Sequence, residues 1–350
     1  MSIRVERRTQ EFRGKIIPVN IRPAGHETVK VKTCGNSKEV MYSQNRSRGG
    51  CTKKISKEEY VDTRTGEVKQ FQKQEKRSDD KISVARSMKL GRDLINTNVT
   101  DPDKCRWITL TYAENMKDTK KLYNDFKNFR KRFKQVYGHT EYITAAEPQA
   151  RGAWHLHVIL IFPDKAPYIP NEKLRELWKQ GFVRVTALAD VDNVGAYLTA
   201  YLGNIPLDEF EEAGKHLTRH QTVKDCTYLE EDGSEVSKRV VKGARLDLYP
   251  AGMRIFRPSR GLRKPEVKYC SEEKAAQEVS DMTMTYETTK FLTDEDTGYS
   301  NIINYRFYTK KKTGAIIYEY DNFGSYERVQ GNPHEKPCQG IHFHQLQCKH

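Results

Sequence analysis

The segment GAWHLHVILIFP, residues 152–163, constrains the fold of this chain more than any other. It is an apolar run of strand length, and it carries two histidines with one leucine between them. Because side chains of a strand alternate between its two faces, His155 and His157 point to one face and Leu156 points to the other. The run therefore predicts a strand that adds apolar residues to a core on one side and presents two imidazoles on the other.

A carboxylate is placed to join the two imidazoles. Glu147 ends the preceding predicted strand, TEYITAAE (140–147), and residues 148–153 are few enough for a tight hairpin. This hairpin would bring Glu147 beside His155 and His157. Two nitrogens and one oxygen, with positions left open, suit a divalent ion such as Mg²⁺ or Mn²⁺. The alternative is a pair of core histidines with hydrogen-bonded neighbours, next to a solvated strand end.

The pattern around this hairpin predicts an α+β fold. Strands are expected at 106–112, 140–147, 154–162 and 182–188, and helices at 83–96, 119–138, 170–181 and 190–204. The clearest helix is 119–138, because Leu122, Phe126, Phe129, Phe133 and Val136 recur at helical spacing. From residue 106 the order is β-α-β-β-α-β-α, which predicts a central antiparallel sheet with helices on one side.

The chain divides into three predicted regions. Residues 1–82 are polar and basic, and we expect a loosely ordered arm with some short strands. Residues 83–210 form the predicted α+β domain. Residues 211–350 form a basic region that contains strands, with a hairpin predicted over 301–324 around KKKTG.

The net charge of +14 favours a polyanionic partner, and nucleic acid is the commonest one. The segment YPAGMRIFRPSRGLRKP (249–265) interleaves aromatic and basic residues. Its candidate DNA-binding residues are Arg254, Arg257, Arg260 and Arg263. The seven cysteines form no CxxC pair, so we expect a reducing, cytoplasmic setting. No apolar run reaches the roughly 18 residues that a membrane span needs, and we expect no membrane partner.

Two tyrosines are candidate nucleophiles. Tyr197 and Tyr201 are four residues apart in the predicted helix 190–204, so they share one helical face. A tyrosine hydroxyl has a pKa near 10 and attacks poorly unless a metal or a base assists it. The alternative is that both tyrosines simply pack against the sheet.

Three motifs in this order resemble those of the HUH endonucleases: ITLTY (108–112), HLH (155–157) and AYLTAYLGN (196–204). Within that superfamily the chain resembles the rolling-circle replication initiator (Rep) proteins of plasmids, phages and mobile elements. The phrase LYPAGMRIFRPSRGLRKP (248–265) is similar to the end of Firmicute-type replication proteins.

The resemblance implies a nicking and joining reaction on origin DNA that is single-stranded or supercoiled. A divalent ion held by Glu147, His155 and His157 would polarise the scissile phosphate. Tyr197 or Tyr201 would attack it, leaving a 5′-phosphotyrosine and a free 3′-hydroxyl that primes replication. The sequence contains no GxxxxGK[ST] phosphate loop, so a host helicase is the expected partner.

One departure from the relatives concerns a lysine that usually follows the active tyrosine by three residues. Here those positions are Ala200 and Asn204. We expect Tyr197, in the middle of the predicted helix, to make the first cut and Tyr201 to serve the second strand transfer. An HUH relaxase or transposase and a non-catalytic nucleic-acid-binding protein are the alternatives. A cupin-like metalloprotein is disfavoured, because no glutamate closely follows His157.

Overall fold

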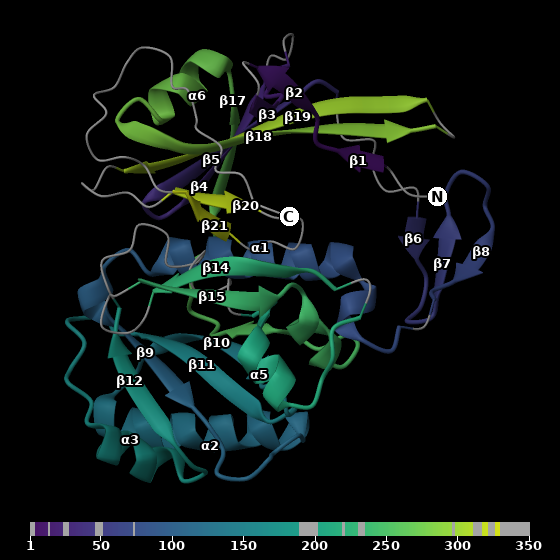
Figure 1. Ribbon diagram of the computed structural model, residues 1–350. Coiled ribbons are helices and arrows are strands. Elements are labelled where there is room, and N and C mark those ends of the chain that lie inside the picture. The colour runs from purple at the N-terminus through teal and green to yellow at the C-terminus, as the bar shows by residue number, and fades with distance from the viewer. Residues whose placement is uncertain are drawn as a thin grey trace.

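The computed structural model of the chain describes residues 4–12, 15–23, 28–45, 52–72, 74–188, 202–218, 221–229, 235–295, 298–310, 317–320 and 326–329. Two antiparallel sheets dominate these residues, and helix α1 (Lys81–Asn98) lies between them (Figure 1). In the part of the chain described, no helix is both long enough and apolar enough to cross a bilayer.

The sheet drawn below α1 in Figure 1 has five strands in the order β12-β9-β11-β10-β16, and each neighbouring pair is antiparallel. Its strands are β9 (Cys105–Leu110), β10 (Glu141–Pro148), β11 (Trp154–Ile161), β12 (Val183–Ala187) and β16 (Phe256–Pro258). The first four lie where the sequence predicts strands. β16 is an addition, because part of the basic segment 249–265 becomes an edge strand beside β10.

Helices α2 (Thr119–Tyr137) and α3 (Asn171–Trp178) cover one face of this sheet. β11 sends Leu156, Val158 and Leu160 to that face, where all three are fully buried. The predicted stripe of α2 packs against them, except that Val136 remains 49% exposed at the end of the helix. Burial of each such leucine or phenylalanine contributes about 1.5–3 kcal/mol. This core fixes which residues of β11 face inward and hence which face carries the histidines.

The opposite face of the sheet meets α1. Ile95 at the end of α1 packs with Ile143 of β10 and Ile159 of β11. The α+β class with a central antiparallel sheet is therefore confirmed, and helices lie on both of its faces. α1 is needed there because the odd-numbered residues of β11 become apolar after His157 and require a cover of their own.

The other large sheet has six strands in the order β1-β18-β19-β5-β4-β17. They are β1 (Arg4–Glu6), β4 (Val29–Cys34), β5 (Ser37–Ser43), β17 (Glu266–Cys270), β18 (Met282–Asp294) and β19 (Tyr299–Lys310). Strands from before and after the five-stranded sheet thus share one ladder. The division of the chain at residues 82 and 210 stays a prediction.

The hairpin predicted over 301–324 is wrong in its pairing. Among the described residues, β19 pairs with β18 on one edge and with β5 on the other. The short strands β20 (Ile317–Tyr320) and β21 (Tyr326–Val329) pair with each other instead. The partner of a strand depends on contacts far along the chain, and a turn-like run such as KKKTG does not determine it.

A buried ionic network joins α1 to the six-stranded sheet. Nζ of Lys32 on β4 lies 2.7 Å from a carboxylate oxygen of Asp93 and 3.2 Å from one of Glu39. Lys89 of α1 also contacts Glu39. Because breaking a buried pair leaves an uncompensated charge, this network holds α1 in one orientation against both sheets.

The remaining elements are short. They are β2 (Thr9–Phe12), β3 (Lys15–Pro18), β6 (Thr52–Lys54), β7 (Glu59–Asp62), β8 (Val68–Gln70), β13 (Ile205–Pro206), α5 (Leu207–Glu212), β14 (Val223–Leu229), β15 (Glu235–Val241) and α6 (Glu272–Glu278), with 3-10 turns at Arg77–Asp79, Pro102–Lys104 and Ala244–Leu248. β13, β14 and β15 form a small sheet, and the turn Ala244–Leu248 follows it directly.

Candidate active site

The structure brings Glu147, His155 and His157 together on one face of the five-stranded sheet. Glu147 is the direct ladder partner of His155 across the β10–β11 hairpin, so the two side chains leave the sheet on the same side. Oε2 of Glu147 lies 2.7 Å from Nε2 of His157. Glu147 itself is only 8% exposed. The hairpin predicted from the sequence therefore does place the carboxylate beside the imidazoles.

Two residues of β9 contact the other nitrogen of His157. Nδ1 lies 3.4 Å from Nε1 of Trp107 and 3.3 Å from Oγ1 of Thr109, the ladder partner of His157. An indole N–H only donates, so with this partner Nδ1 is an acceptor and Nε2 carries the proton that points to Glu147. The Thr109 hydroxyl can donate or accept, and it can therefore also accommodate the opposite tautomer.

A guanidinium that sequence reasoning missed completes the site. Arg245, in the turn Ala244–Leu248, is only 4% exposed. Its Nη1 lies 2.7 Å from Oε1 of Glu147 and donates to the carbonyl oxygen of Pro148 at 2.8 Å. Each carboxylate oxygen of Glu147 thus has its own partner. Nearby, the hydroxyl of Tyr249 donates to the carbonyl oxygen of Ala146 at 2.8 Å, which further fixes β10.

These contacts set the charges of the site. Burial alone would raise the pKa of Glu147, but the charges of Arg245 and His157 outweigh it and hold this pKa at about 2. Burial lowers the pKa of His155 to about 4, against the opposing pull of the Glu147 carboxylate. At neutral pH the site therefore contains an ionised carboxylate, paired with a guanidinium, and a neutral imidazole with a free lone pair.

The donor set has the right chemistry for a divalent ion. A carboxylate oxygen and two imidazole nitrogens leave the sheet on the same side, and an orienting hydrogen bond to the second carboxylate oxygen is typical of metal ligands. The direct contact between Glu147 and His157 occupies the space between two of these donors. Accordingly, no three His, Cys, Asp or Glu side chains form a preformed metal-binding group within the described ranges.

Both candidate nucleophiles, Tyr197 and Tyr201, lie outside the described residues, as does most of the predicted helix 190–204. The described chain resumes at Leu202, which is buried in the main core. The next residues are fixed by main-chain contacts. The Arg245 amide donates to Gly203, and Nε of Arg245 donates to the carbonyl oxygen of Asn204 at 2.8 Å.

Asn204 stands at one of the positions where relatives carry lysine. It is 3% exposed, and its side-chain oxygen accepts a hydrogen bond from the amide of Gly243 at 3.0 Å. Asn204 therefore anchors the chain rather than presenting a side chain to substrate.

The four arginines of the basic segment are all exposed, but they do not form one cluster. Arg257 is opposite Thr144 in the ladder, on the α2 side of the sheet, and its guanidinium lies 3.3 Å from the ring centroid of Tyr123. Arg263 donates to the carbonyl oxygen of Thr97 at 3.3 Å. Arg254 and Arg260 lie in the turns on either side of β16.

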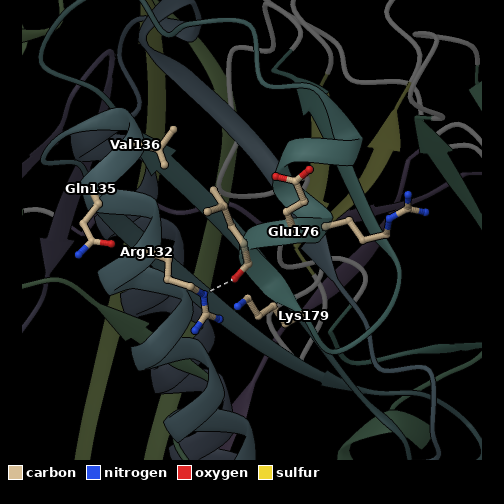
Figure 2. Close-up of a pocket in the computed structure, with 7 residues that line it drawn as sticks. Arg132, Gln135, Val136, Glu176 and Lys179 are labelled. Atoms are coloured by element: carbon tan, nitrogen blue, oxygen red, sulfur yellow. Dashed lines mark hydrogen bonds between the residues drawn. The ribbon is translucent and has the colours of Figure 1, made fainter.

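A groove between α2 and α3 is separate from these residues. Figure 2 shows its lining, with Arg132, Gln135 and Val136 from α2 facing Glu176 and Lys179. Nε of Arg132 donates to the carbonyl oxygen of Leu177 at 2.7 Å, so this arginine ties the two helices together. Because α2 and α3 cover the face opposite Glu147, the groove is not part of the candidate site.

Comparison with known proteins gives one match. Residues 105–205 match the family model of the replication-associated protein ORF2. No curated protein and no solved structure matches the chain. The matched residues run from the start of β9 to the start of β13 and include the β10–β11 hairpin and both candidate tyrosines. The segment that carries Glu147, His155 and His157 is therefore similar to replication-associated proteins of the ORF2 family.

Proposed function

We propose that the protein is a rolling-circle replication initiator that nicks and rejoins single-stranded DNA at an origin. The observation that carries this proposal is the convergence of Glu147, His155 and His157 on one sheet face, within a segment that matches a replication-associated family. The resemblance to HUH endonucleases supplies the reaction type.

Glu147, His155 and His157 would hold one Mg²⁺ or Mn²⁺ ion. Such an ion would polarise the scissile phosphate and neutralise charge that develops on it. The protein's own contribution is orientation. Arg245 holds Oε1 of Glu147 and leaves Oε2 toward the imidazoles, while burial keeps His155 neutral and its lone pair free to bind.

Tyr197 or Tyr201 would act as the nucleophile. Its hydroxyl oxygen attacks the phosphorus and loses its proton, and the bond from phosphorus to the 3′ oxygen breaks. One phosphodiester is thereby exchanged for a 5′-phosphotyrosine, so the reverse reaction rejoins the strand without nucleotide hydrolysis. Two tyrosines would allow a second cut while the first still holds DNA.

The net charge of +14 supports DNA as the substrate, because basic proteins attract the phosphate backbone at long range. We assign backbone contacts to Arg254, Arg257, Arg260 and Arg263, all of which are exposed. Unwinding would come from a host helicase. A conjugative relaxase or a transposase would use the same chemistry on another DNA site.

A non-catalytic nucleic-acid-binding protein is the second candidate. The direct 2.7 Å contact between Glu147 and His157 favours it, because a purely structural pair would have the same geometry.

The test uses the full-length protein with Mn²⁺ and single-stranded oligonucleotides that tile the origin region of its replicon. We expect cleavage at one site, and His157→Ala is expected to abolish it while DNA binding persists. The matched control is His139→Ala, because His139 is an exposed histidine that contacts Glu141 at 3.0 Å. Cleavage by His157→Ala at the wild-type rate would contradict the proposal, and binding with no cleavage by any form would favour the second candidate.

A further inference from the structure

Arg245 connects parts of the chain that are far apart in sequence. Its Nη1 contacts Glu147 and the carbonyl oxygen of Pro148, both at the end of β10. Its Nε and its main-chain amide donate to the carbonyl oxygens of Asn204 and Gly203. Its Nη2 lies 3.7 Å from Oε2 of Glu209 in α5. One side chain thus holds a candidate metal ligand and the residues that directly follow Tyr201 in sequence.

Burial limits what this guanidinium can do. At 4% exposure Arg245 has no surface to offer a DNA phosphate. It remains charged at every accessible pH, and its planar fork fixes several acceptors in one geometry. A lysine would keep the charge, but it could not hold a carboxylate and two carbonyl groups in the same fixed directions.

We propose that Arg245 is a positioning residue that fixes the Glu147 carboxylate relative to the chain that leaves the Tyr197–Tyr201 segment. This inference rests on the proposed nicking function. The distance from Arg245 to Oε1 of Glu147, 2.7 Å, sets which carboxylate oxygen faces the imidazoles. The bonds to Gly203 and Asn204 fix the main chain two and three residues after Tyr201. Metal ligand and nucleophile segment would therefore share one buried anchor.

The test compares Arg245→Gln and Arg245→Lys with Arg130→Lys in the full-length protein. Arg130 is a suitable control because it is a partly buried arginine that donates to Thr140 and stacks on Tyr142, away from Glu147. We expect Arg245→Gln to lower kcat for nicking at least about 100-fold with KM for DNA nearly unchanged, since positioning acts on the reacting groups. Arg245→Lys should recover part of kcat, and Arg130→Lys should match the wild type.

Mn²⁺ binding without DNA gives a readout that is independent of activity. Loss of an outer partner of a metal ligand typically costs 10–100-fold in affinity, and we expect about that loss for Arg245→Gln from the free-Mn²⁺ signal in electron paramagnetic resonance. In a Glu147→Gln background the same substitution should cost little further affinity, because Arg245 acts through Glu147. Full additivity of the two losses would overturn the inference.

The outcomes separate this inference from the proposed function. Nicking by His157→Ala would remove the proposed function itself. Loss of nicking in His157→Ala together with wild-type kcat in Arg245→Gln would overturn only the positioning role. A parallel fall of kcat, DNA affinity and melting temperature in both Arg245 variants would also overturn it, since it would show a general structural role.

Discussion

Nε2 of His157 lies 2.7 Å from Oε2 of Glu147, while the other carboxylate oxygen of Glu147 lies 2.7 Å from Arg245. The carboxylate therefore stands between an imidazole and a guanidinium, at the end of a strand that it shares with the core. This relationship makes Glu147 important both for the stability of the fold and for the proposed chemistry, and the two roles can be measured separately.

Substitution Glu147→Gln should destabilise the fold. It leaves the buried Arg245 guanidinium without its counter-charge, and breaking a buried pair costs about 3–5 kcal/mol. Urea denaturation gives the free energy of unfolding. The control is Glu176→Gln, because Glu176 is exposed and pairs with Lys173, and its loss should cost no more than about 0.5 kcal/mol. Equal losses for the two variants would contradict a buried pair at Glu147.

The stability of the metal-free protein should depend on His155 at mildly acidic pH. The pKa of His155 is about 4 in the folded chain against 6.5 for a free histidine. Between these values the unfolded chain binds a proton that the folded chain does not, so the free energy of unfolding decreases as pH falls from about 6.5 to about 4. At 1.36 kcal/mol for each pKa unit, the full effect is about 3 kcal/mol.

Urea denaturation at pH 7 and at pH 4.5, with a chelator present, checks this dependence. His155→Gln should lose less stability than the wild type between the two pH values. The same loss in both proteins would show that His155 is not buried in a neutral form.

Gly91→Ala in α1 should destabilise the protein although alanine favours helices. A Cβ at Gly91 would lie 2.7–2.8 Å from ring atoms of Phe256 on β16. Such overpacking typically costs about 1–3 kcal/mol, whereas the gain in helix propensity is about 1 kcal/mol. Thermal unfolding should show a lower melting temperature, and Phe256→Leu in the same chain should restore part of it. An increase in melting temperature for Gly91→Ala alone would contradict this close packing.

DNA affinity should fall steeply with salt, because each phosphate contact releases a counterion. Arg254→Ala and Arg260→Ala should each weaken binding and reduce the slope of log K against log salt by about 0.7 for single-stranded DNA. Fluorescence anisotropy at several salt concentrations measures this slope. Arg175→Ala, in the groove between α2 and α3, is the control and should leave the slope unchanged. A slope that no arginine of 254–263 alters would place the DNA elsewhere.

The parts of the site that the sequence predicts correctly are local. Alternation along β11 determines that His155 and His157 share a face, and the short turn before it determines that Glu147 is opposite His155. The stripe of α2 is likewise a matter of spacing, and only Val136, at the end of the helix, departs from it. Each of these inferences spans few residues, so few alternative arrangements compete with it.

The parts that the sequence does not predict are long-range. Arg245 reaches Glu147 from almost a hundred residues later, and nothing local distinguishes it from the other members of a set of 61 lysines and arginines. β16 is another example, because a short basic segment becomes a strand only through its pairing with β10. The wrong hairpin around KKKTG has the same origin, since β19 finds its partners in β18 and β5.

The most direct test of the account is to identify the residue that becomes linked to DNA. Full-length protein is incubated with Mn²⁺ and the cleaved single-stranded origin oligonucleotide, quenched within the first turnover, digested and analysed by mass spectrometry. The account predicts a peptide with DNA on Tyr197, loss of this adduct in Tyr197→Phe, and its persistence in Tyr201→Phe with impaired rejoining. An initial adduct on Tyr201 would reverse the order of the two tyrosines, and cleavage without an adduct on either one would contradict the tyrosine mechanism altogether.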